Sequence, residues 1–457
     1  MLLKEDPLLK QRIELYDNMA SSGNCVGRLS AFLHVFPTPK IQWEFESIGE
    51  NACEPHQVVD GVVERFRGTQ FDIERPLLTD QSWGTLAGPA RVFIKGSASS
   101  CSLGQSDVRA QCITFYLPNC RFLAKNLLGQ ERLTRAITVR TTDGGTAERA
   151  RGIAGRRLSA PLDCTWSLEL ETLEEALLWL EPLRNNVGSY LTTTGRLCHP
   201  GADTPQSQQS DASAGITLEG ARDLLVTLSR LFSFANGGYV GPLYLEGINV
   251  EASEARGSGL VLAFRTTPLE QVGPSWVAID TDLSQYLSCY SSLARMLISP
   301  SWSETFDLVL MWYFQAIQPW DGQYGGKPWP VVASAVGAAL ERLSVAVVVG
   351  EFNERGLCDR DRMARLLDIL GISTERGFPD ECYIDPLMGI RNDATHPRPT
   401  SNLSVSERNA VLSRGIQWIE ETLLWMLGYR GKYVDRTAEY YSSIGSRYDL
   451  STHRSST

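Results

Sequence analysis

The sequence predicts an α+β fold in which a β-rich N-terminal domain precedes an all-α helical bundle. Two observations carry this prediction. Short runs of β-branched and aromatic residues, separated by Gly, Pro, Asn and Asp, fill the first half of the chain. From residue 281 onward the apolar residues recur at helical spacing instead. The chain of 457 residues is also too long for one ordinary core, so we expect more than one domain.

In the β-rich half, which we place at residues 1–275, four segments have strand character: 31–49, 90–96, 111–118 and 135–143. Within the first of them, IQWEFES alternates apolar and polar residues as a half-buried strand does. An amphipathic helix is predicted over 172–191, followed by a mobile loop at 199–215. A second helix begins at Thr217 and ends at Asn236-Gly237-Gly238, and strand character returns over 238–250 and 259–267.

The helical half has apolar periodicity over six segments, which we group as a bundle at 281–430. They cover 282–299, 303–318, 331–349, 359–370, 382–396 and 404–427. The third is the longest apolar stretch of the chain, and Glu341 and Arg342 interrupt it. This pattern favours a buried helix over a membrane span. Residues 431–457 read as a polar tail that is disordered at its end.

Composition narrows the class of protein. The chain is 43% hydrophobic and 21% charged, which is typical of a globular protein. The N-terminal residues contain acids and lack the apolar core of a signal peptide. None of the ten cysteines forms a CxxC pair, which favours reduced thiols over a metal site. We therefore expect a cytoplasmic protein without a metal or cofactor.

A basic segment at 121–157 stands out in a chain whose net charge is −10. Its second half is predicted to be a turn followed by a basic loop. Clustered arginines can contact phosphates whatever the total charge, and the candidate RNA-binding residues here are Arg149, Arg151, Arg156 and Arg157. The alternative interpretation is a solvated face whose charge is balanced by acids elsewhere.

The stretch GIRNDATHPRP, residues 389–399, contains one of only five histidines in the chain. Asn392 and His396 are four residues apart and share a face of the predicted helix, and the long Arg391 side chain can reach the same place. Pro397 disfavours continuation of the helix, so His396 lies at a helix C-terminus, which favours the protonated imidazole.

An arginine and a histidine in one cleft are a minimal arrangement for cutting RNA. The histidine can move a proton to or from the 2′-hydroxyl or the leaving oxygen, while the arginine holds the phosphate oxygens. No metal is required when the 2′-hydroxyl is the nucleophile. A purely structural role is the alternative, because an arginine and a histidine near a helix end can both bind the last helix carbonyls.

Within this stretch, IRNDATHP resembles the Arg-x4-6-His motif of the HEPN superfamily, in which a polar residue follows the arginine as Asn392 does here. The helices at 281–427, including AALERL, resemble an ApeA-like HEPN domain. The β segments that end in LFSFANGGYVGPLYLEGI resemble the region joined to that domain in bacterial phage-defence proteins.

This resemblance implies a metal-independent endoribonuclease that acts as a homodimer in abortive infection. Arg391 would bind phosphate, His396 would transfer protons, and Asn392 would orient the imidazole or the RNA. Glu341 would be an acidic residue of the preceding helix that faces the motif, although an ordinary surface pair with Arg342 is the alternative. The implied partners are RNA, a second copy and a phage-derived trigger or regulatory protein, with no membrane.

Two other interpretations stay open. The helical domain could be a non-catalytic HEPN module for dimerisation or nucleotide binding, whose β-rich domain binds a protein or carbohydrate partner. The β half could also be a carbohydrate- or protein-binding sandwich with a helical oligomerisation domain. The tryptophans of the helical half, Trp302, Trp312, Trp418 and Trp425, are predicted to be core or dimer-interface residues.

Overall fold

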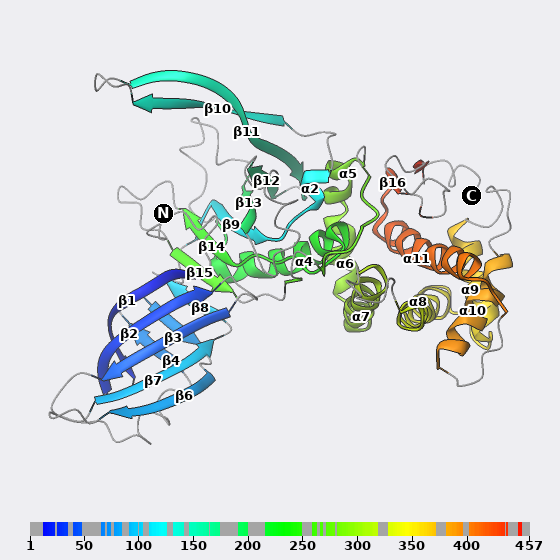
Figure 1. Ribbon diagram of the computed structural model, residues 1–457, viewed down its shortest axis with the longest axis horizontal. Helices are drawn as coiled ribbons and strands as arrows, with labels where there is room; N and C mark the ends of the chain where they lie inside the picture. The colour runs from blue at the N-terminus through cyan, green and yellow to red at the C-terminus, as the bar shows by residue number, and fades with distance from the viewer. Residues whose placement is uncertain are drawn as a thin grey trace. The chain divides into compact units, whose positions relative to one another are not determined.

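The computed structural model (Figure 1) has two compact units. The sheet unit comprises residues 1–121, 130–229 and 239–270, and the helical unit comprises 122–129, 230–238 and 271–457. The structure describes residues 12–22, 25–34, 40–47, 65–68, 71–74, 77–84, 91–98, 100–103, 109–125, 131–140, 146–163, 165–173, 191–199, 215–248, 258–262, 266–267, 271–278, 281–318, 328–371, 381–395, 402–434, 436 and 447–449.

The sheet unit is built on one antiparallel sheet of 15 strands, in the order β10-β11-β12-β13-β9-β14-β15-β8-β5-β4-β1-β2-β3-β7-β6. The strands are β1 Arg12–Ser22, β2 Cys25–His34, β3 Lys40–Ser47, β4 Arg65–Gly68, β5 Phe71–Glu74, β6 Leu77–Gly84, β7 Arg91–Ala98, β8 Ser100–Leu103, β9 Cys112–Pro118, β10 Glu131–Arg140, β11 Thr146–Pro161, β12 Ser167–Leu173, β13 Leu191–Cys198, β14 Tyr244–Ile248 and β15 Ser258–Leu262.

The core of this unit lies where β9 runs between β13 and β14. Phe115 on β9 is fully buried, as are Leu197 on β13 and Leu245 on β14. Gly195 is directly opposite Phe115, and a Cβ at Gly195 would come within 2.1 Å of the phenyl ring. The glycine therefore leaves the space that the ring fills across the two strands.

The helical unit consists of short and long helices joined by turns, together with the end of α4. The helices are α2 Phe122–Lys125, α4 Leu218–Asn236, α5 Leu283–Ser288, α6 Tyr290–Leu297, α7 Pro300–Ile317, α8 Trp329–Ser344, the π-helix η3 Val345–Glu351, α9 Asp359–Leu370, α10 Glu381–Thr395 and α11 Val405–Leu427. A small hairpin of β16 Lys432–Val434 and β17 Arg447–Asp449 follows.

The sequence signals for helix ends are visible in this unit. α4 stops at Gly237, whose φ of +77° suits glycine, and a Cβ there would meet the Gly273 carbonyl oxygen at 2.4 Å. α11 starts with a capping box of Ser404 and Glu407 and ends at Gly428 in the left-handed conformation. Both helices begin and end within two residues of the predicted positions.

The predicted α+β class is confirmed, with an antiparallel sheet region followed by a helical region. By length and composition, the helix from Trp329 to Glu351 could cross a membrane, but 61% of its apolar window is buried inside the protein. Such burial is typical of a core helix of a globular protein, which is how the sequence analysis interpreted this stretch.

Two local predictions need correction. The basic loop expected before residue 157 is β11, a strand of 16 residues that pairs with β10 on one side and β12 on the other. Residues 146–157 pair with β10 and residues 155–161 pair with β12, and this pairing outweighs the weak strand propensity of the Gly and Ala residues. Most of the helix predicted over 172–191 and of the loop predicted over 199–215 lies outside the described residues, but Thr172 and Leu173 belong to β12.

The predicted polar tail is also partly wrong, because its first residues are core residues of the helical unit. Tyr433 is fully buried, and Arg436 is only 7% exposed. The Arg436 Nε donates to Glu420 Oε2 at 2.7 Å, and Glu420 lies fully buried in the middle of α11. Burial raises the pKa of the Glu420 carboxyl above its ordinary value, while Arg436 and the Tyr313 hydroxyl oppose this rise. These contacts fix the C-terminal segment to α11.

This network predicts a strong effect of one substitution on stability. In the Arg436→Met variant, the buried Glu420 carboxylate loses its cation, so the free energy of unfolding should fall by about 3–5 kcal/mol. Arg430→Met is the matched control, since the Arg430 guanidinium bonds only the neighbouring Tyr429 carbonyl among the described residues. Urea denaturation of both variants measures the difference. Equal stability of Arg436→Met and wild type would contradict the buried ion pair.

Candidate functional site

The candidate site lies where α10 crosses α8. α8 is largely buried, because it contacts α7, α10 and α11. Its sequence, WPVVASAVGAALERLS, carries small residues on the side that α10 approaches. Ile384, Leu387 and Ile390 of α10 are buried, so this helix has a continuous apolar face toward the core. Arg391 follows directly after the last of these buried residues.

The Arg391 side chain runs across α8 at Gly337. A Cβ at Gly337 would lie 2.7 Å from Arg391 Cδ and 3.2 Å from Nε, so a larger residue there would require the Arg391 side chain to shift. One helical turn later, Glu341 Oε2 accepts a hydrogen bond from Arg391 Nη2 at 2.6 Å. The side chains are 29% and 36% exposed, so the pair lies at the rim of the bundle.

These contacts bear on the two alternative interpretations from the sequence, namely capping of the helix end by Arg391 and a surface pair of Glu341 with Arg342. Glu341 pairs with Arg391, whereas its neighbour Arg342 binds Thr305 Oγ1 at 3.1 Å and Glu304 at 3.4 Å on α7. The Arg391 guanidinium binds Glu341 and no carbonyl of its own helix among the described residues. A surface pair of Glu341 with Arg342, and capping of the helix by Arg391, are therefore not what this structure forms.

The other motif residues lie nearby on the end of α10. Asn392 is exposed, and the Thr395 hydroxyl donates to the carbonyl oxygens of Asn392 at 3.1 Å and Arg391 at 3.3 Å. Thr395 is therefore the residue that satisfies carbonyls at this helix end. His396 lies outside the described residues and directly follows Thr395, the last residue of α10.

A cavity of about 430 Å³ adjoins the same end of α10. Ala394, three residues after Arg391, lines it together with Ala338, the residue after Gly337. Its other walls come from Trp312 and Gln315 on α7 and from Pro330, Val331, Ser334 and Ala335 on α8. A substrate or a second protein chain can fill this hollow, which is lined by residues three positions from Arg391 on α10 and three positions from Glu341 on α8.

The candidate RNA-binding arginines all lie on β11, in the sheet unit. The Arg157 Nε donates to Glu171 Oε1 at 2.6 Å across the β11–β12 pair, so its charge is already balanced. In the backbone register, Arg156 is opposite Arg132 of β10. The side chains of Arg149, Arg151 and Arg156 lie outside the described residues.

Two cysteines that are far apart in the sequence come together in the sheet. Cys112 on β9 and Cys198 on β13 are paired in register, with their sulfur atoms 2.7 Å apart. The hydrogen bond with Cys112 and burial raise the pKa of the Cys198 thiol above its usual range. A thiol of this kind is a poor nucleophile. Among the described residues, no three His, Cys, Asp or Glu side chains are grouped as metal ligands.

Sequence reasoning missed Gly337, which decides where the Arg391 side chain can lie. A lone glycine within an alanine-rich helix is the available signal, because it costs about 1 kcal/mol against alanine and usually has a packing reason.

Comparison with known proteins gives one result. Residues 299–448 match the family model of the YopA C-terminal domain, which is roughly a third of the chain and covers α7 to α11 and the terminal hairpin. The match includes Gly337, Glu341 and Arg391. No curated protein and no solved structure matches the chain.

Proposed function

We propose that this protein is a HEPN-type, metal-independent endoribonuclease that acts in the cytoplasm as an anti-phage, abortive-infection effector. The observation that supports this best is the placement of Arg391. Its guanidinium is held by Glu341, five residues before His396, and Ala394 on the same helix lines a surface cavity. An arginine that is fixed and partly exposed suits the recognition of a phosphate group.

In the proposed reaction, the 2′-oxygen of a ribose forms a bond to the adjacent phosphorus, and the bond from phosphorus to the 5′-oxygen breaks. His396 takes or supplies the proton that these steps move, and Arg391 stabilises the charge on the non-bridging oxygens. The products are a 2′,3′-cyclic phosphate and a 5′-hydroxyl. Asn392, exposed on the same helix, orients the imidazole or the RNA.

Glu341 has a defined place in this scheme. In the absence of RNA it fixes the Arg391 side chain over Gly337. A partly exposed ion pair contributes at most about 1 kcal/mol, so an RNA phosphate can displace the carboxylate at small cost. Glu341 is thus a positioning residue for Arg391, and the pair keeps the guanidinium in place before substrate binds.

The proposed active form is a homodimer with α10 near its two-fold axis. One protomer supplies a sparse set of groups, and the HEPN resemblance implies a cleft lined by two motifs. The cavity beside Ala394 and the 40% exposed Val331 offer a surface next to Arg391 where the second copy or RNA can lie. A phage-derived trigger would act on this assembly.

Cleavage by point variants tests the proposal. Arg391→Ala and His396→Ala should each reduce the rate of RNA cleavage by about 10²–10⁴-fold, because each removes a group that acts in the transition state. EDTA should leave the wild-type rate unchanged. Cleavage of a labelled RNA, with mass spectrometry of the product ends, gives both the rates and the predicted 2′,3′-cyclic phosphate.

The matched control is Arg360→Ala. Arg360 on α9 binds Asp385 on α10 at 2.7 Å, so it is also an arginine in an exposed ion pair with a neighbouring helix. It should cleave at the wild-type rate. Melting temperatures of all three variants separate lost activity from lost folding. A folded His396→Ala protein with full activity would exclude this mechanism and favour the non-catalytic HEPN module.

The basic strand gives a second test, on RNA binding. If Arg149, Arg151 and Arg156 contact phosphates, their joint replacement by Ser should flatten the dependence of log affinity on log salt by about 0.7 per lost contact on single-stranded RNA. Arg157→Ser serves as the control, since Glu171 already neutralises Arg157. Filter binding between 50 and 200 mM salt, roughly the range over which such contacts are felt, measures the slopes. An unchanged slope in the triple variant would mean that these arginines form a solvated face and do not contact RNA.

A further inference from the structure

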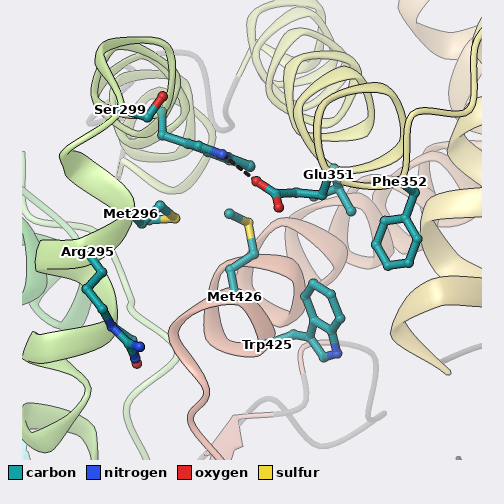
Figure 2. A pocket seen from close by; sticks show the side chains of 10 residues that line it. Arg295, Met296, Ser299, Glu351, Phe352, Trp425 and Met426 are labelled. Atoms are coloured by element: carbon teal, nitrogen blue, oxygen red, sulfur yellow. Dashed lines mark hydrogen bonds between the residues drawn. The ribbon is translucent and has the colours of Figure 1, made fainter.

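A second surface of the helical unit carries features that the proposed nuclease site does not use. We call it the Ile298 face and define it by Arg295, Ile298, Glu351 and Phe352. Arg295, Glu351 and Phe352 line a cavity of about 620 Å³ (Figure 2), and exposed Ile298 lies in the chain between Met296 and Ser299, which also line it. Met296 of α6 and the two residues Trp425 and Met426 at the end of α11 line the cavity. The hollow is therefore walled mainly by aromatic and thioether side chains.

Two residues of the Ile298 face are apolar and exposed to solvent. Ile298 is 79% exposed and Phe352 is 46% exposed, two of the five large hydrophobic side chains that are exposed among the described residues. A third, Val345, is 41% exposed and lines an adjoining cavity of about 550 Å³ that shares Trp302 and Glu351 with the first. A cluster of this kind is typical of an interaction surface.

The local backbone explains why these groups are presented together. The helix that begins as α8 continues as the π-helix η3, and the Phe352 N–H donates to the Val347 carbonyl at 3.1 Å. This wider helical turn ends at Glu351 and Phe352, on the cavity. Single π-turns are often found at functional sites.

Two opposite charges on this face lack a partner of opposite sign. Arg295 donates through Nε to the Ser291 carbonyl at 3.3 Å, and no carboxylate pairs with it in the part of the chain that the structure describes. Glu351 accepts from Trp302 Nε1 at 2.7 Å and likewise has no cation beside it among the described side chains. Figure 2 shows Arg295 and Glu351 on opposite sides of the cavity, with the bond to Glu351 dashed.

We propose that the Ile298 face binds the same face of a second copy of this chain across a two-fold axis. Ile298 enters the partner's cavity, while Arg295 meets the partner's Glu351 and the reverse pair forms on the other side. A two-fold interface uses one patch twice, so the patch must contain both members of each interacting pair. This face holds a protruding side chain beside a hollow and a cation opposite an anion, which meets that requirement.

This inference does not rest on the proposed nuclease activity. The proposed dimer places α10 at its axis, whereas the Ile298 face is formed by α6, η3 and the end of α11. Two different two-fold interfaces on one chain build an assembly larger than a dimer. The number of copies in solution therefore reports on the second interface, whether or not the protein cuts RNA.

The first test is the mass of the full chain in solution, measured by light scattering after size exclusion. Ile298→Asp puts a charge into the apolar hollow and should halve the mass of the wild-type assembly. The control is Val405→Asp, because Val405 is 69% exposed at the start of α11 and lies outside the face. This variant should keep the wild-type mass. Circular dichroism confirms that each variant is folded.

A charge exchange makes the test specific. Arg295→Glu and Glu351→Arg each place like charges opposite one another and should weaken self-association at least about tenfold. The double variant restores opposite charges across the axis and should recover the wild-type mass. A monomeric wild type at tens of micromolar, roughly the range where specific dimers form, would overturn the proposal. So would an unchanged mass for Ile298→Asp, or a double variant no better than the single ones.

Discussion

The close approach of α10 to α8 at Gly337 is the constraint on which the candidate site depends. With hydrogen in place of a side chain, α8 leaves a channel in which the Arg391 side chain lies before it reaches Glu341. Any larger residue there would require the Arg391 side chain to shift from this position. The close approach at Gly337 thus helps to place the cation that gives this helical unit a candidate phosphate-binding group.

The C-terminal segment supports that arrangement through α11, which contacts both α8 and α10. α11 contacts α8 and brings the buried carboxylates of Glu420 and Glu421 into the core, where Arg436 donates to Glu420 Oε2 and the Tyr433 hydroxyl donates to Glu421 Oε1. The match to the YopA C-terminal domain extends to residue 448 and so includes this segment. The segment therefore completes the helical core. A separate feature connects the two candidate surfaces: η3 continues α8 for a further seven residues, so one continuous helix carries Glu341 of the candidate site and Glu351 of the Ile298 face.

Periodicity and capping residues were sufficient to predict most helices, since α4 and α11 follow from local signals such as Gly237 and the Ser404 capping box. The pairing of Glu341 with Arg391 was suggested only by resemblance to HEPN domains. The two predictions that were wrong, the basic loop and the polar tail, concerned residues whose structure depends on partners distant in the sequence. β11 is a strand because β10 and β12 pair with it, and Arg436 is buried because it pairs with the buried Glu420 carboxylate. Local sequence patterns do not identify partners that are distant in the sequence.

RNA cleavage by a Gly337→Ala variant, measured together with its melting temperature, tests the central claim most directly. Alanine favours a helix interior over glycine by about 1 kcal/mol, so the substitution should leave the melting temperature close to wild type or raise it. Its Cβ would lie 2.7 Å from Arg391 Cδ, so the Arg391 side chain must shift. The account predicts a folded protein whose cleavage rate is at least about tenfold lower, because the phosphate-binding group has moved. Wild-type cleavage by folded Gly337→Ala protein would contradict it.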